Sequence, residues 1–282
     1  MKRVLSTGPA ESRFLTNLER LEIPVLSLKK HRALLGDIAD QELHDLLTGL
    51  EDKGWLLRVE RGTYAVVPRA ARGTWHEHPF IIAAAMAPDP YYISYWSALS
   101  FHNLTTQMPR VVVVTIPAGL QRWRTQVTFQ GYRYRFVSRR RTTFFGMRPH
   151  DMIGLNGAAH VEVTIADPEK ALLDSLDEER LAGGIDEIVG ALRRGLANGG
   201  LSSPRLVEDA LRYPNRAVVN RLGYLLSHSG ADRNILDALR GRVRRTGYPP
   251  YLSSGASRVE AYRDSEWNVM VNLPEDSFEH NA

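Results

Sequence analysis

The chain has no cysteine among its 282 residues. Disulfide bonds, thiolate catalysis and cysteine-ligated zinc are therefore excluded, and the composition fits a reducing cytosol. Long apolar runs are also missing: the two most apolar stretches, residues 80–86 and 111–116, are far shorter than the roughly 18–20 residues that cross a bilayer. The start of the chain is too polar for a signal peptide. We therefore expect a cytoplasmic protein with no membrane partner.

The sequence also lacks the motifs of several enzyme classes. It contains no G-x-x-x-x-G-K-[ST], G-x-G-x-x-G, H-E-x-x-H or G-x-S-x-G. His76 and His78 have no third metal ligand nearby in the sequence. The acidic cluster at residues 174–179 lies at a predicted helix end, whereas a nucleotidyltransferase holds magnesium with carboxylates at a strand end. We therefore expect no catalytic residue, no metal and no cofactor.

Charge is distributed unevenly along the chain. The net charge is only +4, yet residues 71–150 carry ten Lys/Arg against two Asp/Glu. Residues 1–70 carry eleven against ten, and residues 151–282 carry fifteen against twenty. A basic middle segment favours a polyanionic partner, although a solvated charged surface has the same composition.

The first seventy residues show three helical patterns. Residues 11–22 place apolar side chains on one stripe, the spacing of an amphipathic helix. Residues 28–35 form a second, short helix, with Ser27 as its cap and Gly36 as its end. A third helix begins after Asp37 or Asp40 and runs to about residue 53. Its core stripe consists of Leu43, Leu46, Leu47 and Leu50.

A β-hairpin follows the third helix. Two short strands meet at Arg61 and Gly62, where glycine supplies the positive φ of a tight turn. Helix, helix, turn, helix and a two-stranded wing is the order of a winged helix-turn-helix. We predict an α+β protein with a winged helix-turn-helix domain at residues 1–68, a linker at 69–79, and a larger mixed α+β domain with a helical segment at 80–282.

In this fold the third helix enters the major groove of DNA. Its leucine stripe leaves polar side chains facing outward, where a glutamine can pair with an adenine edge. Cations on the second helix and the wing can contact phosphates or the minor groove. The predicted DNA-binding residues are Lys29, Lys30, Arg32, Gln41, His44, Thr48, Arg58 and Arg61. Several carboxylates on the third helix repel phosphate, so a winged helix that binds protein remains an alternative.

The larger domain begins with a predicted helix at residues 80–86 and an aromatic-rich helix at 91–103, which we assign to the core. Residues 111–116 form a buried strand, and residues 126–129 and 132–138 form a hairpin. Its second strand alternates aromatic and arginine side chains. A possible second basic surface, for nucleic acid or a toxin, consists of Arg133, Arg135, Arg139, Arg140 and Arg141. The alternative is a half-buried strand whose arginines face water.

Further along, residues 161–166 form a strand, and Asp167 and Pro168 begin a helix. Glu169 and Lys170 are first-turn helix residues or partly buried polar groups, and we favour a structural role over catalysis. Four more helices follow, and the tail at residues 251–272 returns to strand. The predicted helices cover residues 185–198, 203–212, 216–228 and 232–241.

Five segments, in order along the chain, resemble the AbiEi family of antitoxins. The wing, residues 54–64, is similar to the family's "G-x-L-x-R-x-x-R-G-x-Y" pattern. The other four are residues 92–107, the "pEK-x-LlD"-like residues 166–174, the "RLGyLL"-like residues 221–226 and the "W-x-v-x-vN"-like residues 267–272. Tyr95 and Asn103 stand where the family often has glycine, and Ser227 where it often has an acidic residue.

The resemblance implies a function in type IV toxin–antitoxin and phage-defence systems. Proteins of this family bind inverted repeats in their own promoter through the winged helix and repress it. Their C-terminal domain neutralises a nucleotidyltransferase-class toxin, and a stable complex with the toxin is not required. The resemblance thus implies an autorepressor and antitoxin with double-stranded DNA as partner. Two alternatives remain: an enzyme that covalently modifies a partner toxin, and a winged-helix interaction module without DNA binding.

Overall fold

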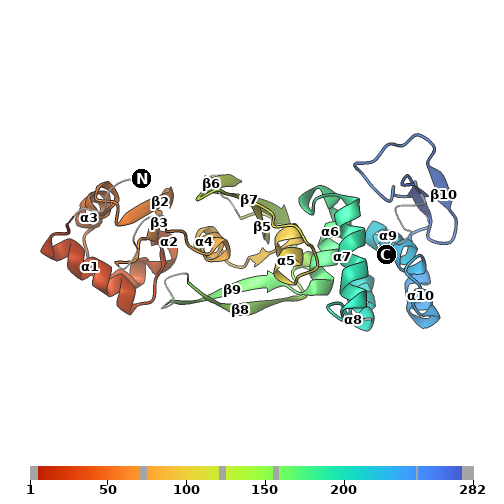
Figure 1. The fold of residues 1–282 in the computed structure, drawn as a ribbon, viewed down its shortest axis with the longest axis horizontal. Helices are drawn as coiled ribbons and strands as arrows, with labels where there is room; N and C mark the ends of the chain where they lie inside the picture. The colour runs from red at the N-terminus through yellow and green to blue at the C-terminus, as the bar shows by residue number, and fades with distance from the viewer. Residues whose placement is uncertain (1–5, 70–74, 121–124, 155–158, 246, 275–282) are drawn as a thin grey trace.

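The structure, a computed structural model, describes residues 6–69, 75–120, 125–154, 159–245 and 247–274. The molecule is elongated (Figure 1). The N-terminal helices lie at one end, a β-sheet occupies the middle, and a group of helices with a C-terminal hairpin forms the other end. The fold is mixed α+β, as the sequence predicts.

The N-terminal elements follow the predicted winged-helix order. They are α1 (Pro9–Arg20), β1 (Val25–Ser27), α2 (Leu28–His31), the 3₁₀ helix η1 (Arg32–Leu35), α3 (Asp40–Asp52), β2 (Leu56–Glu60) and β3 (Thr63–Val66). The three strands pair antiparallel in the order β1-β3-β2. Leu43, Leu47 and Leu50 of α3 are buried in one cluster with Phe14 and Leu18 of α1. The apolar stripes read from the sequence therefore form the core of this region.

Some local details differ from the prediction. The sequence pattern does not indicate β1, because three residues are too few to show an alternation and the partner strand β3 lies far along the chain. Ser27 makes no capping hydrogen bond to α2, and the N-cap of α3 is Ala39, so neither Asp37 nor Asp40 has that role. The second helix tightens into η1 and ends at Gly36, whose φ of +75° explains the glycine.

The middle of the molecule is a six-stranded mixed sheet in the order β6-β7-β5-β4-β9-β8. Its strands are β4 (Tyr92–Ile93), β5 (Val111–Pro117), β6 (Gln126–Phe129), β7 (Tyr132–Arg139), β8 (Met147–Ile153) and β9 (His160–Ala166). The hairpin of β6 and β7 and the valine-rich β5 are as predicted. Strand β5 pairs parallel with β7, so that Val112 lies beside Tyr134 and Val114 beside Phe136.

One prediction for the sheet region is wrong. The helix expected over residues 91–103 is shorter, because Tyr92–Ile93 forms β4 and only Tyr95–Phe101 forms helix α5. Strand β4 has only two residues and lies between its antiparallel partner β5 and its parallel partner β9, so no local sequence pattern indicates it. Strand β8 is also unexpected from its sequence, since it contains Pro149 and several polar side chains and lies at the edge of the sheet.

Helix α4 (Pro79–Met86) joins the winged helix to the sheet. It is buried on nearly all sides, and it contacts β1 and β3 as well as β5 and β9. Val25, Val59 and Ala65 of the winged helix accordingly belong to the same hydrophobic cluster as the sheet. Of the predicted linker, residues 70–74 lie outside the described residues, while Glu77 is buried and its backbone N–H donates to Gln130 Oε1 at 3.0 Å.

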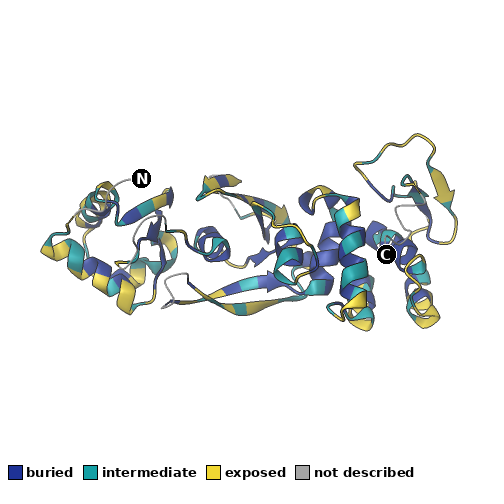
Figure 2. Ribbon diagram, viewed as in Figure 1, coloured by how far each residue is buried: buried dark blue, intermediate teal, exposed yellow. Residues whose placement is uncertain are grey.

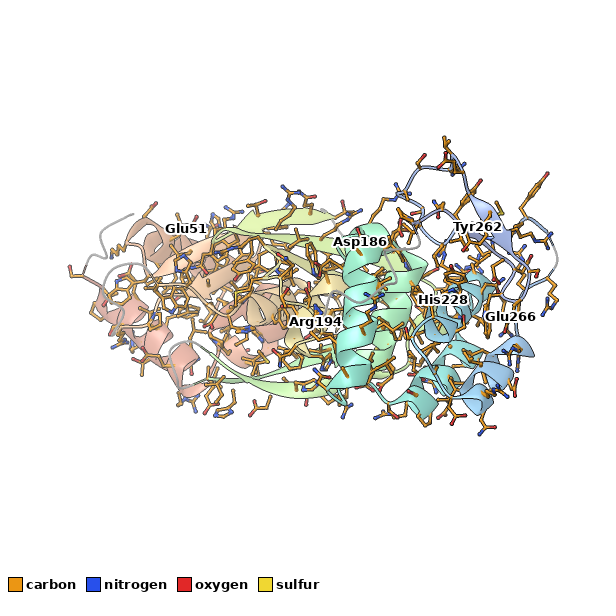
Figure 3. All side chains as sticks on the ribbon, turned by 45° about the vertical axis from the view of Figure 1, so that its right-hand side comes forward. Glu51, Asp186, Arg194, His228, Tyr262 and Glu266 are labelled. Atoms are coloured by element: carbon orange, nitrogen blue, oxygen red, sulfur yellow. The ribbon has the colours of Figure 1, made fainter. Side chains whose placement is uncertain are left out.

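The far end of the molecule is helical and closes with a small hairpin. Its elements are α6 (Pro168–Asp177), the 3₁₀ helix η3 (Glu179–Leu181), α7 (Ile185–Ala197), α8 (Ser203–Arg212), α9 (Arg216–Ser227), α10 (Arg233–Arg240), β10 (Tyr262–Asp264) and β11 (Val269–Val271). The last four helices match the predicted ranges closely. Pro168 is the first residue of α6 as expected, although Asp167 makes no capping hydrogen bond. Figure 3 shows Glu51 of α3 and Glu266 of the hairpin at opposite ends of the chain.

Buried residues occur in all three parts of the molecule (Figure 2). Among the residues that the structure describes, no helix is long and apolar enough to cross a membrane.

Candidate nucleic-acid interface

The outward face of α3 carries the side chains predicted to read DNA. Gln41, His44 and Thr48 are all exposed, because the leucine stripe turns the opposite side of the helix toward the core. Gln41 Nε2 donates a hydrogen bond to Asp45 Oδ1 at 2.8 Å, and Thr48 Oγ1 donates to the His44 carbonyl at 2.9 Å. Both bonds are local to the helix, so the face is open to a partner.

The same helix is strongly acidic. Within Asp40–Asp52 there are five carboxylates and no lysine or arginine. They are Asp40, Glu42, Asp45, Glu51 and Asp52. Carboxylates repel the phosphates that border a DNA groove. Any attraction for a nucleic-acid backbone must therefore come from neighbouring elements.

The predicted cations of the second helix differ in their surroundings. Lys29 is exposed and has no ion pair with a described residue. Lys30 Nζ is bound to the Asp89 carboxylate at 3.2 Å and lies 5.1 Å from the centre of the Tyr91 ring. Arg32 sits at the turn before α3, where it donates to the carbonyls of Gly36 and Ile38 and pairs with Asp40. Of these three, the structure leaves Lys29 as the cation best placed for phosphate.

The wing presents two further cations. Arg58 of β2 and Arg61 at the hairpin tip are exposed, and neither is ion-paired within the described part of the chain. Gly62 has a φ of +75°, as the predicted turn requires, and its carbonyl accepts a hydrogen bond from the Leu28 N–H at 2.8 Å. That bond fixes the wing tip against the start of α2.

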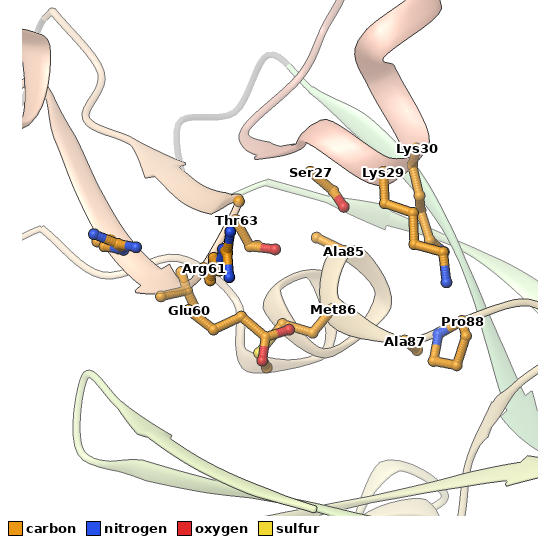
Figure 4. A pocket seen from close by; sticks show the side chains of 13 residues that line it. Ser27, Lys29, Lys30, Glu60, Arg61, Thr63, Ala85, Met86, Ala87 and Pro88 are labelled. Atoms are coloured by element: carbon orange, nitrogen blue, oxygen red, sulfur yellow. The ribbon is translucent and has the colours of Figure 1, made fainter. Parts of the chain in front are cut away.

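Lys29, Arg58 and Arg61 lie around one concavity, shown in Figure 4. We call it the wing hollow. It has a volume of about 740 Å³ and is bounded by wing residues 58–63, by Ser27, Lys29 and Lys30, and by residues 85–88 at the end of α4. The sequence patterns do not indicate this hollow, because α4 is far from the wing along the chain.

The predicted second basic surface divides into two parts. Arg133 and Arg135 alternate with buried Tyr134 on β7 and are exposed. Arg139 is half-buried instead: its Nε donates to Tyr95 Oη at 2.9 Å, and it lies 3.8 Å from Glu178. Arg140 and Arg141 are exposed beyond the end of β7. The five arginines therefore do not form one continuous row.

The Lys170 region is a sealed polar cluster. Lys170 Nζ is bound to Asp174 and donates to Tyr92 Oη at 3.1 Å, and Tyr213 Oη donates to Asp174 at 2.8 Å. Burial lowers the pKa of Lys170 and raises the pKa values of Tyr92 and Tyr213. Since Lys170 and Asp174 are almost wholly inaccessible, the cluster joins the sheet to α6 and α8–α9 and presents no group to a substrate.

The histidines near the predicted linker have local contacts. His78 Nδ1 accepts a hydrogen bond from the Phe80 N–H at 3.1 Å and so caps α4, and burial lowers the pKa of His78. No group of three or more histidine, aspartate or glutamate side chains that suits a metal ion occurs among the described residues.

Comparisons with known proteins show the fold alone. No protein-family model and no curated protein matches the sequence. Among solved structures, the chain is similar to one titled "Crystal structure of RV2827C protein from Mycobacterium tuberculosis". The TM-score is 0.62 at 19% sequence identity, and the match covers 95% of this chain and 93% of the other. At this identity the match shows that the overall fold is shared over nearly the whole of both chains.

Proposed function

We propose that this protein is a DNA-binding transcriptional regulator that acts in the cytoplasm. The observation that carries the proposal is an exposed Gln41–His44–Thr48 face on α3 beside the wing cations Arg58 and Arg61, which have no ion pair with any residue that the structure describes. In this arrangement α3 supplies contacts to base edges, and Lys29 and the wing arginines supply contacts to phosphates. The carboxylates of α3 then lower the affinity for DNA in general, which favours discrimination between sequences.

The resemblance to AbiEi antitoxins extends the proposal. On that basis the DNA partner is an inverted repeat in the protein's own promoter, and the protein is the antitoxin of a type IV system. Its functional partner is a nucleotidyltransferase-class toxin, and the antitoxin itself carries out no catalytic step. Exposed Arg133 and Arg135 on β7 are available for contact with that toxin or its nucleic-acid substrate.

A gel-shift assay with the native upstream DNA and a scrambled duplex of the same length tests the proposal. We expect preference for the native DNA, with affinity that falls steeply as salt is added. Gln41→Ala should cost about 1–3 kcal/mol on the native site and much less on the scrambled duplex. Equal affinity of the wild-type protein for both duplexes would overturn the proposal.

One observation favours a second function. The five carboxylates of α3, without a compensating cation on the helix, suit a basic protein surface better than a nucleic acid. Under this alternative α3 is a protein-docking face. Co-purification with a basic partner that is abolished by charge reversal on α3, together with absence of DNA binding, would favour it.

A further inference from the structure

The wing hollow concentrates cations, and three of them, Lys29, Arg58 and Arg61, have no ion pair within the described part of the chain. Some other basic side chains of the winged helix are paired with carboxylates, as Lys53 is with Glu11 and Arg69 with Glu19. Among the described residues that line the hollow, Lys30 is neutralised by Asp89, and the cations Lys29, Arg58 and Arg61 face the one carboxylate of Glu60, which leaves an excess of two positive charges. Like charges gathered without partners destabilise a fold unless a ligand of opposite charge compensates them. The hollow therefore has the electrostatics of an anion site.

Its walls are held in place without a ligand. The Leu28 N–H to Gly62 carbonyl bond ties the wing to α2. The Lys30–Asp89 ion pair, with Lys30 over the Tyr91 ring, ties α2 to the segment after α4. A concave site whose walls are already fixed loses little entropy on binding.

The floor of the hollow has a different character. It is formed by residues 85–88 at the C-terminal end of α4, beneath the wing in Figure 4. The end of a helix carries negative partial charge and carbonyl groups that accept hydrogen bonds. Val59, Met86 and Ala87 are buried beside it and give this side an apolar surface. The hollow thus pairs a cationic wall with an apolar, hydrogen-bond-accepting floor.

From this asymmetry we propose that the wing hollow binds a free nucleotide. The phosphates lie against Lys29, Arg58 and Arg61, and the base lies on the apolar side, where its amino group faces the end of α4. A volume of about 740 Å³ falls within the roughly 300–1,000 Å³ of small-molecule sites. A DNA backbone fits less well, because its regularly spaced phosphates would also lie against the helix end, and it presents no free base to the apolar side.

A nucleotide in the hollow would also regulate DNA binding. That regulatory role rests on the proposed function, whereas nucleotide binding itself does not. Arg58 and Arg61 are also the proposed phosphate contacts of the wing. A nucleotide bound in the hollow neutralises them, so nucleotide and DNA compete for the same side chains.

The direct test measures nucleotide binding to the full chain without DNA. A ribose-labelled fluorescent ATP is titrated with protein, and unlabelled ATP, adenosine and pyrophosphate are then added as competitors. We expect saturable binding that ATP displaces, with adenosine and pyrophosphate each at least about tenfold weaker, because each lacks one half of the ligand. Pyrophosphate as effective as ATP would show a phosphate site that does not use the apolar floor, and would overturn the proposal, as would absence of binding.

Variants locate the site. Arg58→Ala and Lys29→Ala should each weaken ATP binding by about tenfold, whereas Arg13→Ala, at an exposed cation of α1, should leave it unchanged. Ala85→Leu partly fills the hollow without removing charge and should weaken ATP more than DNA. The Lys29 and Arg58 variants decide the matter if Ala85→Leu does not fold. Equal effects of Arg13→Ala and Arg58→Ala would contradict the assignment.

A gel shift with the native DNA then separates the two proposals. DNA binding that ATP weakens supports both. ATP binding by a chain that binds no DNA retains the nucleotide site and removes the regulator. DNA binding without ATP binding removes the nucleotide site alone.

Discussion

Gln41 donates a hydrogen bond to Asp45 across one turn of α3, with 2.8 Å between Nε2 and Oδ1. The bond engages one amide proton and leaves the other proton and the carbonyl oxygen of Gln41 for a partner. It therefore orients the side chain that is proposed to read a base edge. The same carboxylate repels phosphates, so one residue both positions Gln41 and lowers general affinity for DNA.

Asp45→Asn separates these two effects. The asparagine keeps a carbonyl acceptor for Gln41 but removes the charge. We expect affinity for native and scrambled DNA to rise together, by roughly twofold to fivefold at low salt, with the preference for native DNA retained. Asp45→Ala should raise affinity similarly but reduce the preference, because Gln41 loses its partner. Gel shifts with both duplexes measure this, and an Asn variant with unaltered affinity would argue against phosphates near α3.

The wing arginines should act on all sequences alike. Arg58→Ala and Arg61→Ala each remove an exposed cation that has no ion pair among the described residues, so we expect the fold to tolerate either substitution. We expect weaker binding to native and scrambled DNA, and a plot of log affinity against log salt whose slope decreases by about one per arginine. Arg13→Ala is the matched control, with an expected slope equal to that of the wild type. Loss of affinity for native DNA alone would place the arginines at bases.

Sequence periodicity predicts elements that pack through one face. The helices α7 to α9 and the stripe of α3 repeat apolar residues at helical spacing, and their buried sides match. Strands β1, β4 and β8 depend on partners elsewhere in the chain, and two of them have only two or three residues. Local patterns cannot identify them.

The candidate site likewise combines features that local patterns predict with features that depend on residues far along the chain. Exposure of Gln41 and Thr48 follows from the leucine stripe and is predictable. That Lys30 is neutralised while Lys29 is not depends on Asp89, which reaches it from 59 residues away. The wing hollow depends in turn on α4 packing beneath β1 and β3, a tertiary contact that residue types do not reveal.

The winged helix should lose stability in acid through Glu11. Its carboxylate accepts hydrogen bonds from Lys53 Nζ and the Gly8 N–H, and these lower the pKa of Glu11 below the ordinary 4.5. The folded pKa lies below the unfolded one, so the stabilisation is complete above about pH 4.5 and is lost as pH falls through the folded pKa. Urea unfolding of the wild type and Glu11→Gln should differ at pH 7 and converge in acid. A constant difference across that range would contradict the linkage.

The buried ion pair predicts a larger effect. Asp174→Ala leaves the Lys170 ammonium inaccessible and without its carboxylate, and should lower the free energy of unfolding by about 3–5 kcal/mol. Lys170→Met combined with Asp174→Leu removes both charges at similar volume and should recover much of the loss. Chemical denaturation measures both. A double variant less stable than Asp174→Ala would show that the charged pair itself is needed for the fold.

Gly223 of α9 has no room for a side chain, because a Cβ at this position would fall on the six-membered ring of Trp267. The Trp267 side chain is buried, and it anchors the β10–β11 hairpin against α9. Gly223→Ala should therefore displace the ring and lower the free energy of unfolding by roughly 1–3 kcal/mol, with a changed near-ultraviolet tryptophan signal. Gly190→Ala in α7 is the matched control: its Cβ would meet only the Arg194 guanidinium at 3.6 Å, so the gain in helix propensity should raise stability by about 0.5–1 kcal/mol. Opposite signs for the two substitutions in urea unfolding would show that contact with Trp267, rather than helix propensity, requires glycine at position 223, and equal signs would refute this.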